Sequence, residues 1–186
     1  NSYRVEEQVA ALYVRLDFDG QAAARPYFGN AGLRMVRTRT HVEGARMVDA
    51  DGAAQVLPLT HDGEDAILLP SLNLKANLTD QLILRFAASK NMSPPSFSQL
   101  NSTFSISPAY QNAGDVVPTG VGTGTSNGNA LLKPEKVTQY DVALEWYFSP
   151  IGYLYGTVFK KDITDLIFSV SNTETYDLTG SNGTVL

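Results

Sequence analysis

Apolar and polar side chains alternate with a period of two along much of this sequence, and helical periodicity is nearly absent. The clearest early example runs from residue 10 to residue 18. On one side it carries Ala10, Leu12, Val14, Leu16 and Phe18, and on the other Tyr13, Arg15 and Asp17. Successive side chains of a β-strand point to opposite faces, so this segment predicts a strand with one apolar side.

Five further segments show the same pattern and predict an all-β protein of antiparallel, up-and-down strands. They cover residues 31–40, 71–78, 82–89, 139–148 and 153–161, and residues 166–170 predict a seventh strand or an extension of the sixth. The facing of residues 153–161 is ambiguous from sequence. Tyr153, Tyr155 and Phe159 share one parity, whereas Leu154 and Val158 share the other.

The predicted connections alternate between short and long. Tight turns are expected at residues 79–81 and 149–152, whereas the second and third strands are separated by about thirty residues and the fourth and fifth by more than about forty. The stretch 119–129, rich in Gly, Ser, Asn and Thr, is interpreted as a flexible loop. Its three alternating glycines lack the strand and helix that a phosphate-binding loop requires. We therefore expect tight turns at one end of a sheet and long loops at the other.

This layout is typical of outer-membrane β-barrels, whose periplasmic turns are short and extracellular loops long. Trp146, Tyr147 and Phe148 lie near a tight turn, with Tyr153 and Tyr155 across it, and we interpret them as an interfacial aromatic girdle. A soluble β-sandwich or lipocalin-like barrel would also alternate, so the pattern by itself leaves both architectures open.

Composition excludes several functions. The 186 residues carry a net charge of −5 and no cluster of lysine and arginine, which argues against a nucleic-acid partner. There is no cysteine, which excludes disulfides, thiol nucleophiles and cysteine-ligated zinc. No apolar run approaches the length of a transmembrane helix, and the polar start at Asn1–Gln8 is unlike a secretion signal.

Catalysis finds little support. The two histidines, His41 and His61, fall in a predicted loop, and the pair Asp162 and Asp165 is interpreted as structural. We expect no catalytic residues, no metal site, no cofactor and no enzyme activity.

Several stretches occur in an order and spacing that resemble one known family. They include residues 14–18, 29–34, 69–74, 84–90, 132–135, 140–141, 144–148 and 159–163, which read VRLDF, GNAGLR, LPSLNL, LRFAASK, LKPE, YD, LEWYF and FKKDI. They resemble the C-terminal half of TonB-dependent outer-membrane receptors, particularly those of Xanthomonas and Caulobacter relatives.

The resemblance implies a 22-stranded transmembrane barrel in the outer membrane of a Gram-negative bacterium. It also implies a plug domain inside the barrel and energy supplied by the TonB–ExbB–ExbD complex through an N-terminal part that is missing from this sequence. Residues 1–186 would then be a fragment of about six or seven barrel strands, without the plug and the final strands.

The expected function is import of a scarce solute, such as a siderophore, cobalamin or an oligosaccharide, through a barrel embedded in outer-membrane lipid. The alternatives are a soluble all-β carbohydrate-binding module and a passive porin-like channel. Residues expected to face the lumen or plug are Arg15, Arg34, Asn73, Lys75, Arg85, Gln139, Asp141 and Glu145. Candidate ligand-binding residues in the long loop are Phe97, Phe104, Tyr110 and Gln111.

Overall fold

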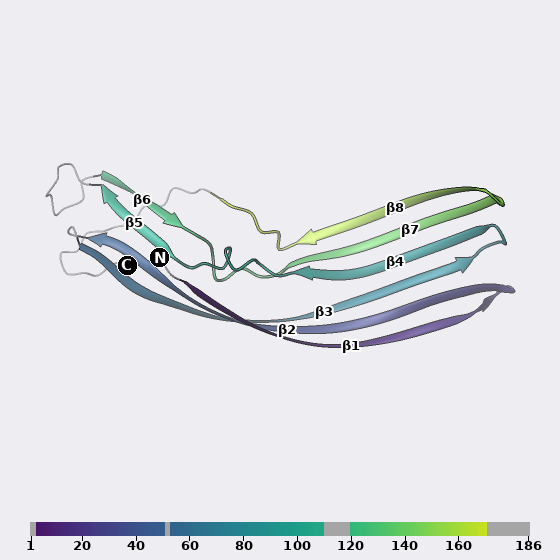
Figure 1. Cartoon of the computed structure of the whole chain (residues 1–186), viewed down its shortest axis with the longest axis horizontal. Coiled ribbons are helices and arrows are strands. Elements are labelled where there is room, and N and C mark those ends of the chain that lie inside the picture. Colours follow the sequence, from purple (N-terminus) through teal and green to yellow (C-terminus); the bar gives the residue numbers. More distant parts are fainter. Residues whose placement is uncertain (1–2, 51–52, 110–119, 171–186) are drawn as a thin grey trace.

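The computed structural model describes residues 3–50, 53–109 and 120–170, and within them every regular element is a β-strand. Eight strands form one curved sheet (Figure 1). They are β1 (Arg4–Ala22), β2 (Arg25–Ala50), β3 (Ala53–Asn77), β4 (Leu82–Ser93), β5 (Phe104–Ala109), β6 (Gly120–Ser126), β7 (Glu135–Ser149) and β8 (Gly152–Thr164). The all-β prediction is confirmed.

Six strands form an antiparallel wall in the order β1, β2, β3, β4, β7, β8. The pairing of β1 with β2 begins at Arg4 and Glu43, so the last part of β2 extends beyond β1. There β5 takes the place of β1 and pairs with Arg46–Val48 of β2 in parallel, while β6 pairs with β5. The hairpin of β5 and β6 thus extends the sheet at the end opposite to the tight turns.

Three tight turns lie together at one end of the wall (Figure 1). The sequence predicted two of them, at residues 79–81 and 149–152, and the structure adds the turn between β1 and β2. In the turn between β1 and β2, Ala23 and Ala24 both have positive φ, which is the signature of a type I′ hairpin turn. In the turn between β3 and β4, the Thr79 hydroxyl accepts hydrogen bonds from the backbone N–H groups of Gln81 and Leu82. We refer to this end as the tight-turn end and to the other as the long-loop end.

Several predictions about the connections are wrong. The expected thirty-residue loop after the second strand is instead the outer half of a long hairpin, in which β2 and β3 stay in register up to Ala50 and Ala53. His41 and His61 therefore lie on strands. Residues 120–126, which we interpreted as part of a flexible loop, form β6. No strand covers residues 166–170.

The strand register assigns every side chain of the wall to one of two faces, because directly paired residues of neighbouring strands share a face. One row joins Asp17, Asn30, Asn73, Ala87, Asp141 and Phe159, and the adjacent row on the opposite face joins Phe18, Gly29, Leu74, Phe86, Val142 and Val158. We call the first the polar face and the second the apolar face.

The small buried core lies on the polar face near the long-loop end. Among the described residues, the buried ones include Val36, Thr38, Val42, Ile67, Leu100 and Thr103. The segment between β4 and β5 folds back over β2 there, and Ser102 approaches so closely that a Cβ at Gly44 would lie 2.1 Å from the Ser102 Oγ. A glycine at position 44 therefore lets the loop pack against the inner surface of the wall.

Candidate functional site

The apolar face is a continuous surface of hydrophobic side chains across the six strands of the wall, and most of its large members outside β4 are exposed. Leu12 is 78% exposed and Val158 is 75% exposed. Other exposed members are Val14, Leu16, Leu33, Met35, Leu68, Leu72, Val142, Leu144, Trp146 and Leu154. A monomeric protein in water rarely exposes so large a contiguous apolar surface, which indicates a hydrocarbon environment for this face.

At the long-loop end, the apolar surface stops along an oblique border. On β1 the first polar residue beyond it is Gln8, whereas on β8 it is Lys160, which lies in the same row as Leu16 of β1. The border thus shifts by about eight residues over five neighbouring strand pairs. With about 3.3 Å per residue and about 4.8 Å between strands, the strands cross the border at roughly 45°. This is close to the tilt of strands in membrane barrels.

All eight residues predicted to face a lumen lie on the polar face, opposite to the apolar surface. They are Arg15, Arg34, Asn73, Lys75, Arg85, Gln139, Asp141 and Glu145. An open groove on this face is lined by residues of five strands, including Asp19, Phe28, Asn30, Asn73 and Asp141. The polar face is therefore the concave one. What these side chains contact in the assembled protein stays a prediction.

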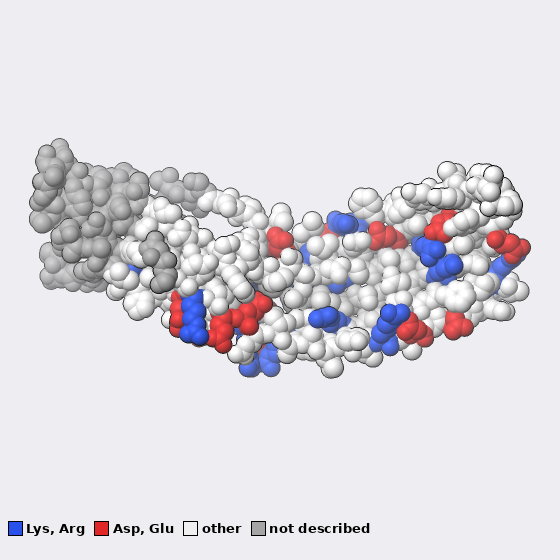
Figure 2. All heavy atoms as spheres, viewed as in Figure 1, with Lys and Arg blue, Asp and Glu red and all other residues white. Residues whose placement is uncertain are grey.

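Most of the polar side chains on this face are paired with one another. The Arg85 guanidinium donates to the Glu145 carboxylate at 2.6 Å, and Asn73 donates to Asn30 at 3.0 Å across neighbouring strands. Arg15 donates to Asp17 at 2.9 Å along the same strand. Figure 2 shows basic and acidic side chains lying close together over the sheet. Because positive and negative side chains are interspersed, the electrostatic potential over the concave face is neither strongly positive nor strongly negative.

The aromatic residues near the last tight turn divide between the two faces, which corrects the prediction of a single girdle. Trp146 and Phe148 lie on the apolar face, with ring centroids 5.4 Å apart. Tyr147, Tyr153 and Tyr155 form a stacked series on the polar face, where Tyr147 donates a hydrogen bond to Glu145. Of these five residues, Trp146 and Phe148 are therefore the two placed to meet a membrane interface.

Two of the four candidate ligand-binding residues can be placed. Phe97 lies in the turn that precedes β5 and is 55% exposed. Phe104 begins β5, and the Arg46 guanidinium lies over its ring at 5.8 Å from the centroid. Tyr110 and Gln111 lie outside the described residues. The two phenylalanines thus belong to the segment that folds over the long-loop end of the concave face.

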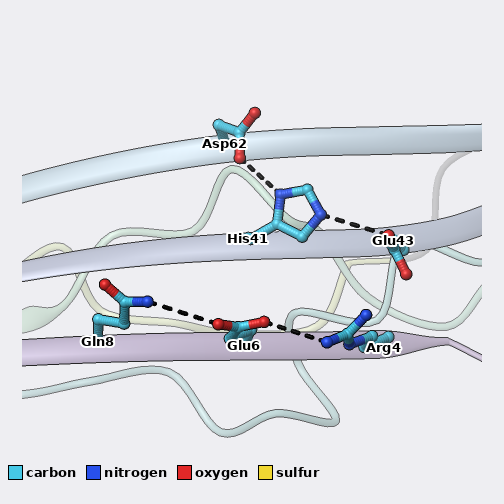
Figure 3. A network of polar contacts seen from close by, with 6 residues as sticks. All are labelled: Arg4, Glu6, Gln8, His41, Glu43 and Asp62. Carbon is cyan, nitrogen blue, oxygen red and sulfur yellow. Dashed lines mark hydrogen bonds and ion pairs between the residues drawn. The ribbon is translucent and has the colours of Figure 1, made fainter.

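A network of charged residues lies beyond the oblique border on the same side of the sheet as the apolar surface (Figure 3). His41 of β2 bonds through Nδ1 to Asp62 of β3 at 2.6 Å and through Nε2 to Glu43 at 3.4 Å. On β1, Arg4 donates to Glu6 at 3.2 Å. We call these five residues the outer ladder. No group of three or more histidines or carboxylates in the described part of the chain is arranged to hold a metal ion.

Next to the outer ladder, Glu64 of β3 accepts hydrogen bonds from Arg37 at 2.7 Å and from Arg39 at 3.2 Å, both of β2. These two arginines hold the pKa of Glu64 below its ordinary value. Sequence reasoning missed both clusters because residues 41–43 and 60–64 were assigned to a loop, so the partners of Arg37 and Arg39 on β3 were not recognised. A signal was present, since Arg37, Arg39, His41 and Glu43 are charged or polar at every second position.

A curved sheet with one apolar face, one paired polar face and tight turns gathered at one end defines the wall of a transmembrane β-barrel. The chain matches the family model described as "TonB dependent receptor-like, beta-barrel" over residues 1–185, and it belongs to that family. The resemblance stated from the sequence motifs is thereby confirmed. The expectation that the chain belongs to an outer-membrane transport receptor is confirmed with it. No curated protein and no solved structure matches the chain.

Within the described residues, no helix is long and apolar enough to cross a membrane.

The outer ladder predicts that the stability of the β2–β3 hairpin depends on pH. His41 lies beyond the apolar border, and its hydrogen bonds to Asp62 and then Glu43 raise its pKa above the ordinary value of about 6.5. A raised pKa means that the protonated imidazole stabilises the folded hairpin fully below the unfolded pKa. This stabilisation is lost as pH rises through the folded pKa. We expect Asp62→Asn to lower the pKa of His41 toward its ordinary value, as measured by NMR of the imidazole protons across pH.

The same experiment has a control on a different pair. Lys136→Gln removes the ion pair between Lys136 of β7 and Asp165, which directly follows β8, and should leave the titration of His41 unchanged. If the pKa of His41 were unchanged in Asp62→Asn, Asp62 would not be the group that stabilises the protonated imidazole.

Proposed function

We propose that this barrel wall belongs to an active importer that takes up a scarce hydrophilic solute through the outer membrane. The observation that carries the proposal is the division of one continuous sheet into an apolar convex face and a paired polar concave face. The apolar face suits outer-membrane lipid, and the concave face suits a plug domain that fills and seals the lumen. Most of the eight lumen residues would then contact the plug rather than the solute.

The position of the loop supports solute capture at the long-loop end, which faces the outside in barrels of this kind. Phe97 is exposed, and Phe104, with the Arg46 guanidinium over its ring, lies at the start of the β5–β6 hairpin, so both lie near the entrance of the concave face. Aromatic rings in such loops stack against sugars and chelates. We assign initial solute contact to this segment and the energy for release to the TonB–ExbB–ExbD complex, acting through a plug.

The charge pattern favours one class among siderophores, cobalamin and oligosaccharides. Basic and acidic side chains on the concave face are interspersed and largely paired, as in Arg85 with Glu145 and Arg15 with Asp17. Such a wall neither concentrates nor repels a strongly charged solute. A neutral, hydroxyl-rich oligosaccharide fits this surface better than an anionic chelate.

The proposal is tested by uptake in cells. A strain lacking the full-length gene is complemented with wild type or with the Phe97→Ala/Phe104→Ala double variant. Uptake is then measured at limiting concentrations of a ferric siderophore, cyanocobalamin and plant oligosaccharides. We expect wild type to restore uptake of one solute, in a manner that requires TonB. The double variant should lower that uptake about tenfold, because aromatic contacts are frequent hot spots of binding energy.

The comparison also separates the competing functions. Uptake that persists without TonB would support the passive porin-like channel instead. Equal uptake by the double variant, at equal surface abundance, would remove Phe97 and Phe104 from solute capture. A receptor found free of the membrane fraction would contradict the importer altogether.

A further inference from the structure

The concave face carries a run of aromatic side chains along its last two strands. Tyr147 of β7 stacks on Tyr153 of β8 with ring centroids 5.9 Å apart, and Tyr153 stacks on Tyr155 at 6.3 Å. Phe159 follows on the same face of β8, closer to the long-loop end. We call these four residues the aromatic track. It leads from the tight-turn end toward the middle of the wall.

The membrane interface does not account for the aromatic track, which lies on the face opposite to the apolar surface. Trp146 and Phe148, the neighbours of Tyr147 on β7, take the lipid side instead. The rings of the track are nevertheless accessible, since Tyr153 is 63% exposed and Tyr155 is 66% exposed. Nearly parallel rings at these centroid distances are offset, so part of each ring face stays open. These open faces point into the lumen and call for a partner other than lipid.

The polar groove of the concave face borders the aromatic track. This groove has a volume of about 690 Å³, and Asp141 and Ala143 of β7 line it. The register pairs these two residues directly with Phe159 and Thr157 of β8. Arg85 lines the groove from β4, opposite to Ala143. The track and the groove are therefore two sides of one continuous surface, the first aromatic and the second polar.

The polar groups beside the rings balance one another in charge and keep capacity for hydrogen bonds. Glu145 lies opposite to Tyr155 and accepts from Arg85 at 2.6 Å and from the Tyr147 hydroxyl at 3.2 Å. The hydroxyls of Tyr153 and Tyr155 form no hydrogen bond within the part of the chain that the structure describes. A phenolic hydroxyl both donates and accepts. The track thus offers free donors and acceptors next to a neutral ion pair.

This combination fits the chemistry of a sugar chain. A pyranose ring presents C–H groups on its flat face and hydroxyls around its edge, so it needs an aromatic plane and, beside it, groups that donate and accept. An anionic chelate would instead meet the Glu145 carboxylate beside the tyrosines, whose charge Arg85 only balances. Among hydrophilic solutes, the surface therefore favours a neutral oligosaccharide.

We propose that the aromatic track is a transit subsite for a neutral oligosaccharide, along which the solute moves through the lumen toward the tight-turn end. The inference rests on the proposed function, since it takes the protein to be an importer whose tight turns face the periplasm. Tyr153 and Tyr155 stack on the sugar rings, while their hydroxyls and the groove residues exchange hydrogen bonds with the sugar hydroxyls. Several similar, moderate contacts in series let a solute enter and still leave.

The test measures uptake by cells that carry the full-length receptor with Tyr153→Ala/Tyr155→Ala. The probes are tritium-labelled cellohexaose, xylohexaose and maltohexaose, each over a range of concentrations. For a hexaose that wild type imports, we expect the maximal TonB-dependent rate to fall about fivefold, because two stacking contacts are lost. Binding of the same hexaose to cells without TonB should be unchanged, since capture occurs at the long-loop end. Tyr153→Phe/Tyr155→Phe keeps the rings and should retain most of the rate.

The matched control is Tyr13→Ala, which removes an exposed tyrosine from the same concave face on β1, at the other edge of the wall. Its uptake should stay within about twofold of wild type, as is usual for a surface substitution outside a site. An equal loss of rate in Tyr13→Ala would overturn the proposal. Increased entry of vancomycin into cells with Tyr153→Ala/Tyr155→Ala would also overturn it, because the tyrosines would then hold a plug in place.

Failure of this inference is distinguishable from failure of the proposed function. If wild type imports a hexaose and the alanine double variant imports it equally, at equal surface abundance, only the aromatic track is wrong. If wild type imports a ferric siderophore or cyanocobalamin and none of the hexaoses, the importer stands and the saccharide subsite is rejected. The heat-dependent gel mobility of each variant reports whether the barrel is folded, so a loss of uptake through misfolding is recognised directly.

Discussion

Leu72→Arg is expected to destabilise the folded barrel by about 2–4 kcal/mol, the cost of an arginine near the bilayer midplane on a lipid-facing strand. Leu72 lies in the middle of the apolar stretch of β3, with Ala31 and Ala88 beside it in the same row. Its side chain is 36% exposed on the apolar face, with no carboxylate in its row. The measurement is urea unfolding of the full-length receptor refolded into lipid vesicles.

The neighbouring residue supplies the control. Ser71→Arg introduces the same charge one position earlier, on the concave face, where it lies in a row with Arg15, Gln139 and Lys161. We expect it to cost less than about 1 kcal/mol, because a polar lumen solvates the guanidinium. Equal destabilisation by the two substitutions would mean that the two faces do not differ in environment.

Gly128→Ala is expected to displace the segment that folds over the concave face. An added Cβ would lie 2.3 Å from the Gln99 carbonyl oxygen and 2.9 Å from that of Asn101, so the backbone itself must move. The same region is held by hydrogen bonds from Asn129 N–H to the Gln99 carbonyl and from Asn127 N–H to the Thr103 carbonyl. Overpacking of this kind typically costs about 1–3 kcal/mol.

The expected readout is local. Hydrogen exchange of the backbone at Leu100 and Thr103, both buried in the folded loop, should accelerate, and solute uptake should fall with the displaced Phe104. Gly124→Ala is the control, because its Cβ would lie 3.6 Å from the Phe104 ring, an ordinary contact. Unchanged exchange in Gly128→Ala would show that the loop tolerates the added methyl group and is not fixed by this approach.

The face of each wall residue was predictable from sequence where one side of a strand is apolar. Arg85 and Glu145, for example, alternate with Leu84 and Leu144, so their common face followed from the period of two before their pairing was known. What the alternation does not contain is the register between strands. The hydrogen bond between Arg85 and Glu145 depends on that register, which joins residues sixty positions apart.

The outer parts of β2 and β3, residues 41–50 and 53–64, escaped prediction for a physical reason. Beyond the border both faces meet polar surroundings or a folded loop, so His41 and Glu43 lie on one face while Thr40 and Gly44 lie on the other. Without an apolar face the hydrophobic alternation disappears, although the backbone hydrogen bonds of the ladder continue. For the same reason β6, composed largely of glycine, serine and threonine, was taken for a loop.

The sequence by itself determined the all-β class, the tight-turn end, the apolar surface and the family, because these depend on local alternation, turn residues and motif order. The tertiary structure decided where the loop folds, which aromatic residues meet the membrane interface, and the oblique border at which the apolar surface stops. These features arise from the relative shift of neighbouring strands. That shift is set by hydrogen bonding between distant segments, and no single segment of the sequence encodes it.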